Sequence, residues 1–240
     1  MSPVDAPPFL DMMPLEMGLT DFYRSAIAQK AVMAITGLIL FGFAVAHMAG
    51  NLKLYLGPEH INEYAHFLRT VGEPLLPAMA LLWIARVVLL VAVVLHIHSA
   101  WSLTMMNVAA RPIGYRDRGF AKATYAARTM RWGGVIILLF VIYHLLHLTT
   151  GTVHHDFRPD DVYHNMVSGF QVWWVSGFYI VANLALGLHL FHGLWSMFSS
   201  LGWTNPRYAP LIRTFATVFA VVVTAGNLTF PIFVLLGFVR

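Results

Sequence analysis

Four histidines stand where they could hold a buried cofactor. They are His47, His96, His144 and His189, and each lies in the C-terminal half of a different long apolar segment. A titratable side chain in hydrocarbon is costly unless it has a partner. Imidazole is also the commonest protein ligand for metals. The spacing therefore predicts a cofactor or metal ion bound between helices.

The composition is that of a membrane protein. The 240 residues are 58% hydrophobic and 11% charged, whereas about a quarter of the residues of a soluble domain are charged. A membrane span needs roughly 20 apolar residues. Five segments reach that length, at about 27–50, 76–103, 132–151, 172–199 and 213–238. We expect one all-α domain over residues 1–240, a polytopic membrane protein with five transmembrane helices.

The chain has no cysteine. This excludes disulfides, iron–sulfur ligands and the covalent attachment motif of c-type haem. Any haem must be held without covalent bonds to the protein, and any iron–sulfur cluster must belong to another subunit.

The basic residues predict the orientation in the membrane. Five spans put the termini on opposite sides, and one side carries most of the Lys and Arg: Arg24, Lys30, Arg111, Arg116, Arg118, Lys122, Arg128, Arg131, Arg207 and Arg213. The other side carries Lys53, Arg69, Arg158 and Arg240. The positive-inside rule then places the N-terminus in the cytoplasm and the C-terminus outside, as in a cell inner membrane. The basic face suits a partner protein or anionic lipid; no nucleic-acid motif is present, so no nucleic-acid partner is expected.

Two shorter segments complete the predicted organisation. The N-terminal residues lack the basic stretch and cleavage site of a signal peptide, so we expect residues 1–25 to form a retained cytoplasmic arm at the membrane interface. In the first external loop, residues 58–68 suit a short helix that begins at Pro58 and ends near Gly72.

Helix polarity predicts how the histidines pair. Spans one and three run in the same direction, so His47 and His144 approach the external leaflet together. By the same geometry, His96 and His189 approach the cytoplasmic leaflet. Each pair could bind one haem iron from both faces, and two imidazoles leave no open position for oxygen. Two such haems at two depths would form an electron path across the bilayer.

Other interpretations of the histidines remain open. They could be packed polar residues between helices, or, because His147 and His192 each follow a principal histidine by three positions, ligands of a metal or proton transporter. Transporters usually also place Asp or Glu within their spans, and these five spans contain neither. That favours haem.

Residues two apart point about 200° apart on a helix, so only one of His96 and His98 can face a haem.

The order of motifs along the chain resembles the single-chain, five-helix, di-haem cytochrome b subunits of succinate dehydrogenase and fumarate reductase. The resemblance covers about residues 20–235. The motifs that carry it are residues 21–25 (DFYRS), 30–37 (KAVMAITG), 46–52 (AHMAGNL), 96–104 (HIHSAWSLT), 143–147 (YHLLH) and 188–195 (LHLFHGLW). The order of these motifs over four helices makes the resemblance specific, whereas any single histidine is weak evidence.

The resemblance implies a function. The first four helices would form a haem-binding bundle, with His47 and His144 on a distal haem b and His96 and His189 on a proximal one. Such a subunit anchors a flavoprotein with FAD and an iron–sulfur protein on the cytoplasmic face, and exchanges electrons with menaquinone or ubiquinone. The enzyme would oxidise succinate or reduce fumarate, while this chain would bind neither dicarboxylate nor FAD. A cytochrome b of another respiratory complex, such as a hydrogenase or formate dehydrogenase, is the nearest alternative.

Cationic and hydroxyl side chains near the membrane faces are candidates for binding haem propionates. At the cytoplasmic haem these are Arg24, Ser25, Lys30, Arg128 and Arg131. Arg86 lies inside the second span, where a cation needs a partner. We expect it to face the external propionates or a quinone.

Quinone chemistry needs groups that relay protons. The first external loop supplies candidates close to the predicted distal haem: Asn62, Tyr64, His66 and Glu73. The alternative for these residues is a solvated loop helix. Some members of the family have a glutamate two positions before the fourth histidine, linked to transmembrane proton transfer, but Gly187 occupies that position here. No proton route through it is expected.

Overall fold

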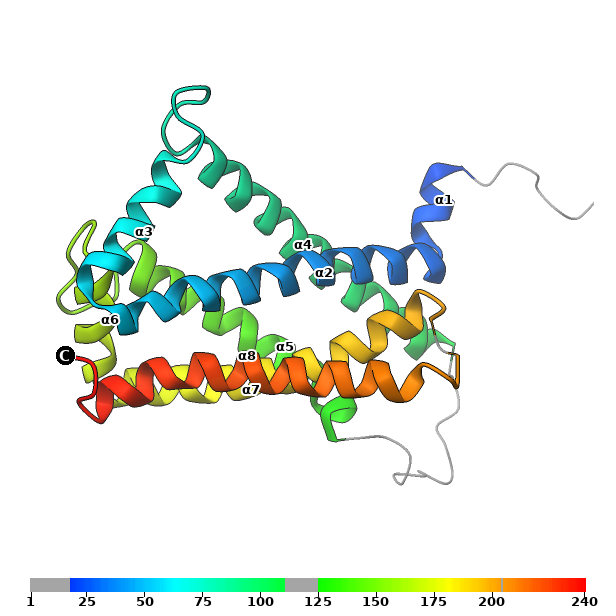
Figure 1. Ribbon diagram of the computed structural model, residues 1–240. Helices are drawn as coiled ribbons and strands as arrows, with labels where there is room; N and C mark the ends of the chain where they lie inside the picture. Colours follow the sequence, from blue (N-terminus) through cyan, green and yellow to red (C-terminus); the bar gives the residue numbers. More distant parts are fainter. Residues whose placement is uncertain (1–17, 111–124, 204) are drawn as a thin grey trace, which may run out of the picture.

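The computed structural model describes residues 18–110, 125–203 and 205–240 (Figure 1). All regular secondary structure in these ranges is helical. Five helices are long and apolar enough to cross a membrane: Ala26–Leu56, Ala80–Ala109, Met130–Thr149, Trp173–Ser200 and Ala209–Leu235. The predicted all-α architecture with five helices suited to cross a membrane is therefore confirmed, while the haem-binding bundle, the kind of membrane and the sidedness of the termini stay predictions.

The elements follow the chain in a simple order. In the described residues, five shorter helices accompany the five long ones. In chain order the elements are α1 (Leu19–Arg24), α2 (Ala26–Asn51), η1 (Leu52–Leu56), α3 (Pro58–Thr70), α4 (Ala80–Ala109), α5 (Tyr125–His144), η3 (Leu145–Thr149), α6 (Val162–Gln171), α7 (Trp173–Ser200) and α8 (Ala209–Leu235). Figure 1 shows α1 at one end of the molecule and α3 with α6 at the other. We call these the α1 end and the α3–α6 end.

Part of the predicted arm and of the basic loop lies outside the described residues. Of residues 1–25, the structure describes 18–25, which contain α1. Arg111, Arg116, Arg118 and Lys122 fall outside the described ranges, and so does the side chain of Arg128.

Local chemistry explains where the helices begin. Ser25 caps α2, because its hydroxyl accepts a hydrogen bond from the Ala28 backbone N–H at 3.2 Å. Gly57 has φ 101°, a conformation open to glycine, and Pro58 follows in the first turn of α3. The helix predicted over residues 58–68 is present as Pro58–Thr70. Asp161 caps α6 by accepting from the His164 N–H.

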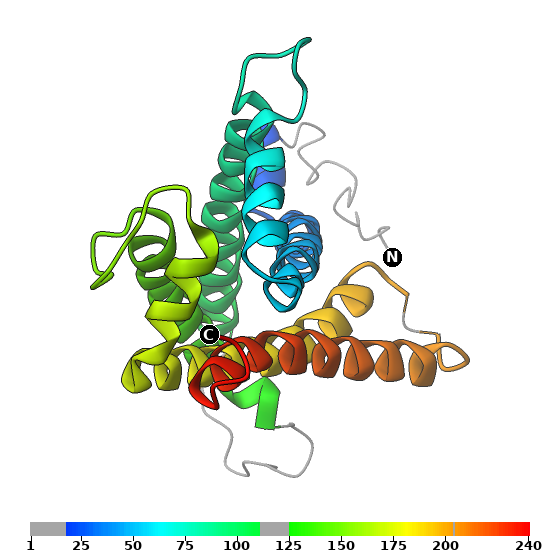
Figure 2. The same ribbon diagram turned by 60° about the vertical axis from the view of Figure 1, so that its left-hand side comes forward.

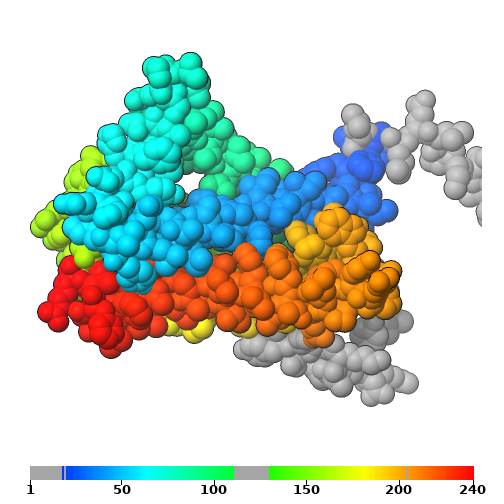
Figure 3. Space-filling view, viewed as in Figure 1, coloured from blue at the N-terminus to red at the C-terminus, as the bar shows by residue number. Residues whose placement is uncertain are grey.

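The long helices pack in a branched arrangement. α7 lies along α8, α2 lies along α4, and α5 lies along α7, while α2 also contacts α7 and α8. Figure 2 shows α4 standing away from the layer that α7 and α8 form. Figure 3 shows α8 and α2 side by side on one face. The fifth span, α8, thus packs against two of the four spans expected to form the bundle, α7 and α2.

Small residues explain why α8 packs so closely. Gly187 of α7 lies against Thr224 of α8, and Gly226 of α8 lies against Met48 of α2. A Cβ atom at either glycine would collide with these side chains. Close approach at small residues is a common way for membrane helices to associate, because van der Waals packing drives it.

The surface and the core agree with a membrane setting. Large apolar side chains such as Leu90, Val94 and Trp101 of α4 are exposed along the spans, as expected where lipid is the solvent. Several large, almost fully buried apolar side chains lie toward the α3–α6 end, among them Leu54, Ile61 and Phe170. This packing holds the ends of the spans together.

Candidate functional site

The structure brings the four principal histidines together as two pairs. The ring centroids of His47 on α2 and His144 on α5 are 5.8 Å apart. Those of His96 on α4 and His189 on α7 are 6.3 Å apart. Four different helices thus supply the rings, in the pairing that helix polarity predicts.

The two pairs lie at different levels of the bundle. His96 hydrogen-bonds to Thr36 of α2, and His47 follows Thr36 by eleven residues, which is about 16 Å along a helix. On α5, a Cβ at Gly134 would lie 3.9 Å from the His189 ring, and His144 is ten residues farther, or about 15 Å. The His96–His189 pair is therefore nearer the α1 end, and the His47–His144 pair nearer the α3–α6 end.

The ring separations fit a shared metal ion. A metal–imidazole bond is about 2 Å long and each nitrogen lies about 1 Å from its ring centre, so two imidazoles on one ion have centroids about 6 Å apart. Both pairs are close to that value. The planes within each pair are inclined by 86° and 58° respectively.

Hydrogen bonds leave Nε2 of His96 available for a metal. The Thr36 hydroxyl donates to the Val32 carbonyl at 2.7 Å, so at 3.2 Å it accepts from His96 Nδ1–H. A hydrogen bond at one ring nitrogen fixes the tautomer and presents the other nitrogen as the ligand. Across the pair, the buried Nδ1 of His189 has no hydrogen-bond partner in the described part of the chain. A buried polar atom without a partner calls for an explanation, and a group bound at this site would supply one.

A π-helical turn follows His144. η3 (Leu145–Thr149) widens the end of the span, and single π-helical turns in membrane and soluble helices are frequent at functional sites. Both His144 and His147 reach the hydroxyl of Tyr179 on α7, at 3.2 and 3.0 Å. The His144 and His147 rings therefore lie on the same side of this helix end.

His47 has a different environment. It is exposed and its ring stacks on Phe43 at 5.2 Å. Its Nε2 lies 3.3 Å from Nδ2 of Asn51, whose amide N–H donates to it. Ligation of a metal through Nε2 thus requires the Asn51 amide to turn away.

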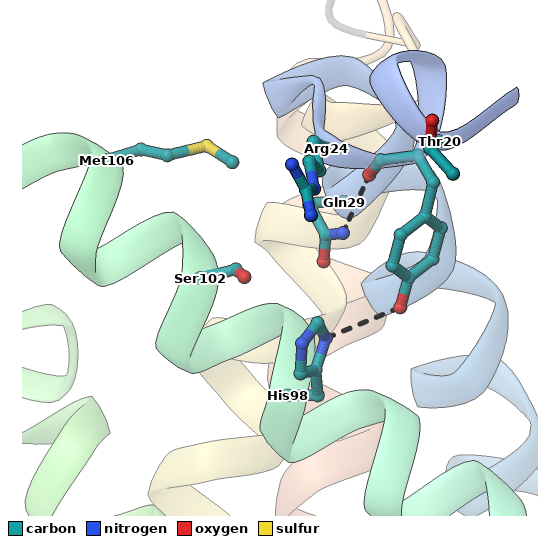
Figure 4. A pocket seen from close by; sticks show the side chains of 7 residues that line it. Thr20, Arg24, Gln29, His98, Ser102 and Met106 are labelled. Carbon is teal, nitrogen blue, oxygen red and sulfur yellow. Dashed lines mark hydrogen bonds between the residues drawn. The ribbon is translucent and has the colours of Figure 1, made fainter. Parts of the chain in front are cut away.

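His98 points away from the pair that His96 joins, as its position two residues later predicts. Its Nδ1 lies 3.3 Å from the Tyr23 hydroxyl of α1. Both side chains line a cavity of about 590 Å³ at the α1 end, together with Thr20, Arg24, Gln29, Ser102 and Met106. Figure 4 shows these side chains converging from α1, α2 and α4, with Gln29 donating to the Tyr23 carbonyl.

The candidate propionate ligands are spread over several environments. Arg24 lines the cavity just described, whereas Ser25 is engaged in capping α2. Lys30 and Arg131 are exposed near the starts of α2 and α5. Arg86 is exposed and lies 4.9 Å from the centre of the Trp83 ring. An aromatic face is thus the partner of this intramembrane cation.

The four quinone candidates do not converge on one point. Asn62 joins α3 to α6, because it donates to Asp161 and accepts from the Tyr163 N–H. Tyr64 packs over Gly50, one turn beyond His47. His66 is exposed on α3, and Glu73 is exposed in the turn before α4. Tyr64 is therefore the candidate nearest to the His47–His144 pair.

Polar residues after η3 form a fixed loop. His154 donates through Nε2 to the Asn165 carbonyl at 2.9 Å, and its Nδ1 accepts from the Asp156 N–H at 3.0 Å. Burial lowers the pKa of the His154 imidazole below its ordinary value of 6.5. His164 contacts the Asp156 carboxylate at 2.8 Å. With both nitrogens engaged, His154 serves to hold the loop rather than to transfer protons.

Comparisons of the chain with protein-family models, with curated proteins and with solved structures returned no match. Within the ranges that the structure describes, no group of three or more His, Cys, Asp or Glu side chains is arranged to hold a metal ion. The histidine pairs are thus the residues on which a functional proposal depends.

Proposed function

We propose that this chain is the di-haem cytochrome b membrane anchor of a succinate:quinone oxidoreductase. One observation carries the proposal: four helices bring four histidines together as two pairs, at two levels about 15 Å apart along the bundle. Haem suits pairs of histidines, because the porphyrin supplies the other four ligands of the iron.

The residues present fit this cofactor. The separation of His96 from His189 suits two imidazoles that would hold one iron between them, and Thr36 leaves Nε2 of His96 free. Gly37 and Gly134 keep side chains away from the two rings. Bound haem would supply one-electron transfer through a six-coordinate iron.

The side chains of this chain would perform four tasks. The histidine pairs would hold the two cofactors at fixed depths, and the apolar spans would exclude water from them. Arg24, in the cavity at the α1 end, would offer a guanidinium to an anionic propionate. Near the other pair, Tyr64 would offer a hydroxyl to a quinone. Flavoprotein and iron–sulfur subunits would supply or accept the electrons at the α1 end.

Haem content of the purified full-length chain tests this proposal. A pyridine haemochrome assay should give two b haems per chain. Copurification of a flavin-containing and a cluster-containing subunit, with succinate-dependent quinone reduction or the reverse, should follow from the native membrane. Absence of haem would overturn the proposal and favour a metal or proton transporter. Two haems with a hydrogenase or formate dehydrogenase partner would assign the chain to another respiratory complex.

A further inference from the structure

The Tyr179 hydroxyl lies between two imidazoles at the His47–His144 level. Tyr179 is 4% exposed, and its oxygen is 3.2 Å from Nδ1 of His144 and 3.0 Å from Nδ1 of His147. A hydroxyl can donate one hydrogen bond while accepting another. Tyr179 can therefore join the two rings in a single hydrogen-bonded chain.

Metal binding by His144 would determine which atoms donate and which accept in this series of hydrogen bonds. A neutral His144 that binds a metal through Nε2 carries its proton on Nδ1, so Nδ1–H donates to the Tyr179 oxygen. The Tyr179 O–H must then donate to His147, whose Nδ1 presents a lone pair. Hydrogen bonds in such a series polarise and strengthen one another.

The surroundings of His147 suit this role as the final acceptor. The ring is 1% exposed and stacks between Tyr143, at 5.5 Å, and His154, at 4.6 Å. A buried ring between aromatic faces is held in place and is costly to charge. His147 is thus held at a fixed position as the acceptor.

We propose that Tyr179 is a positioning residue for the His144 ligand, and that its hydroxyl transmits a hydrogen bond from His144 to His147. This rests on the proposed haem ligation by His144. An acceptor at Nδ1 raises the basicity of a ligating imidazole. The hydrogen bonds through Tyr179 should therefore favour oxidised over reduced iron at the His47–His144 pair and leave the His96–His189 pair unaffected.

Potentiometric titration of the haem-loaded, full-length chain tests the inference. The haem that is lost in His144→Ala identifies the signal to follow. Tyr179→Phe should raise the midpoint potential of that haem, so that its reduced-to-oxidised ratio at a fixed potential increases about threefold. The other haem should be unchanged.

Tyr143→Phe is the matched control. Its hydroxyl is buried nearby without a hydrogen-bond partner among the described residues, so its removal should shift neither haem. His147→Leu provides a second variant, since it removes only the final acceptor; a smaller shift in the same direction is expected.

The outcomes separate this inference from the proposed function. Unchanged potentials in both Tyr179→Phe and His147→Leu, or equal shifts of both haems, would overturn the positioning role alone. A wild-type chain without haem would overturn the role and the proposed function together.

Discussion

His96 and His189 connect two helices that otherwise share little packing. Their ring centroids are 6.3 Å apart, yet α4 packs mainly along α2, and α7 packs along α5 and α8. The branch formed by α2 and α4 therefore meets the rest of the bundle partly through this histidine pair. A ligand bound between the two rings would join the branches directly.

Removal of one ring from this pair should remove one haem. We expect His189→Ala to retain one b haem per chain, because the His47–His144 pair is on another level. His98→Ala should retain two, since His98 faces Tyr23 instead. Pyridine haemochrome content and the split α-band of the reduced spectrum measure both. Retention of two haems in His189→Ala would contradict the assignment.

The same variant should loosen α4 selectively. Because the pair joins α4 to α7, loss of the bound group should raise amide hydrogen exchange along α4 more than along α7, which α5 and α8 still hold. Hydrogen–deuterium exchange of His189→Ala against His98→Ala, in the same detergent, provides the comparison. Equal increases in both helices would show that the pair is not the link.

Close packing of α7 on α8 depends on the absence of a side chain at Gly187. A methyl group there would collide with Thr224, so Gly187→Ala should destabilise the chain by about 1–3 kcal/mol. Gly177→Ala on the same helix should be harmless, because nothing lies within 4 Å of its Cβ position. Thermal unfolding in detergent measures both.

A double-mutant cycle with Thr224→Ala identifies the cause. If the collision with the Thr224 side chain is responsible, the double variant should recover most of the stability that Gly187→Ala loses. If the stability losses of the two single variants simply added in the double variant, the collision with Thr224 would not be the cause.

The spans and the ring pairs could be predicted from sequence for one physical reason. Hydropathy determines which segments cross the membrane, and alternating direction then determines which ends meet. The position of a histidine within its span consequently determines its depth. The contact of α8 with α7 could not be predicted from hydropathy. It depends on which small residue of one apolar helix faces which side chain of the other.

The residues that support the histidines were harder to predict. Thr36 and Tyr179 come from helices other than those of the rings they contact, so only the three-dimensional packing reveals them. Asn51 did leave a signal: it follows His47 by four residues, and residues four apart share a helix face. In the first external loop, Asn62 has suitable chemistry for a quinone, and the structure shows its amide hydrogen-bonded to Asp161 and Tyr163.

The junction of α3 with α6 should be sensitive to acid. Hydrogen bonds from the His164 N–H and from Asn62 lower the pKa of the Asp161 carboxyl below its ordinary value of 3.8. A depressed carboxyl pKa stabilises the fold above the ordinary pKa, and this contribution is lost as the pH falls from about 4 through the lower folded value.

Variants of Asp161 separate the cap from the charge. Asp161→Ala should cost about 1 kcal/mol at neutral pH, as expected for loss of a helix cap. Asp161→Asn can still cap α6, so it should lower the stability at neutral pH less than Asp161→Ala does. Because asparagine does not titrate, this variant should also lose less stability as the pH falls. Unfolding midpoints between pH 3 and pH 7, at about one-unit intervals, measure the difference. An unchanged acid profile in Asp161→Asn would assign the loss to other groups.

Asn51 should oppose cofactor binding at the His47–His144 pair. Its amide N–H occupies the Nε2 lone pair of His47, and this hydrogen bond must break before Nε2 can bind a metal. We expect Asn51→Leu to raise the haem affinity of this level by about threefold, the worth of one modest hydrogen bond. Titration of haem into the haem-free chain, followed by absorbance, measures it. Asn227→Leu is the matched control, because Asn227 bonds to the Val223 carbonyl of its own helix. A fall in affinity in Asn51→Leu alone would mean that the amide supports the bound state instead.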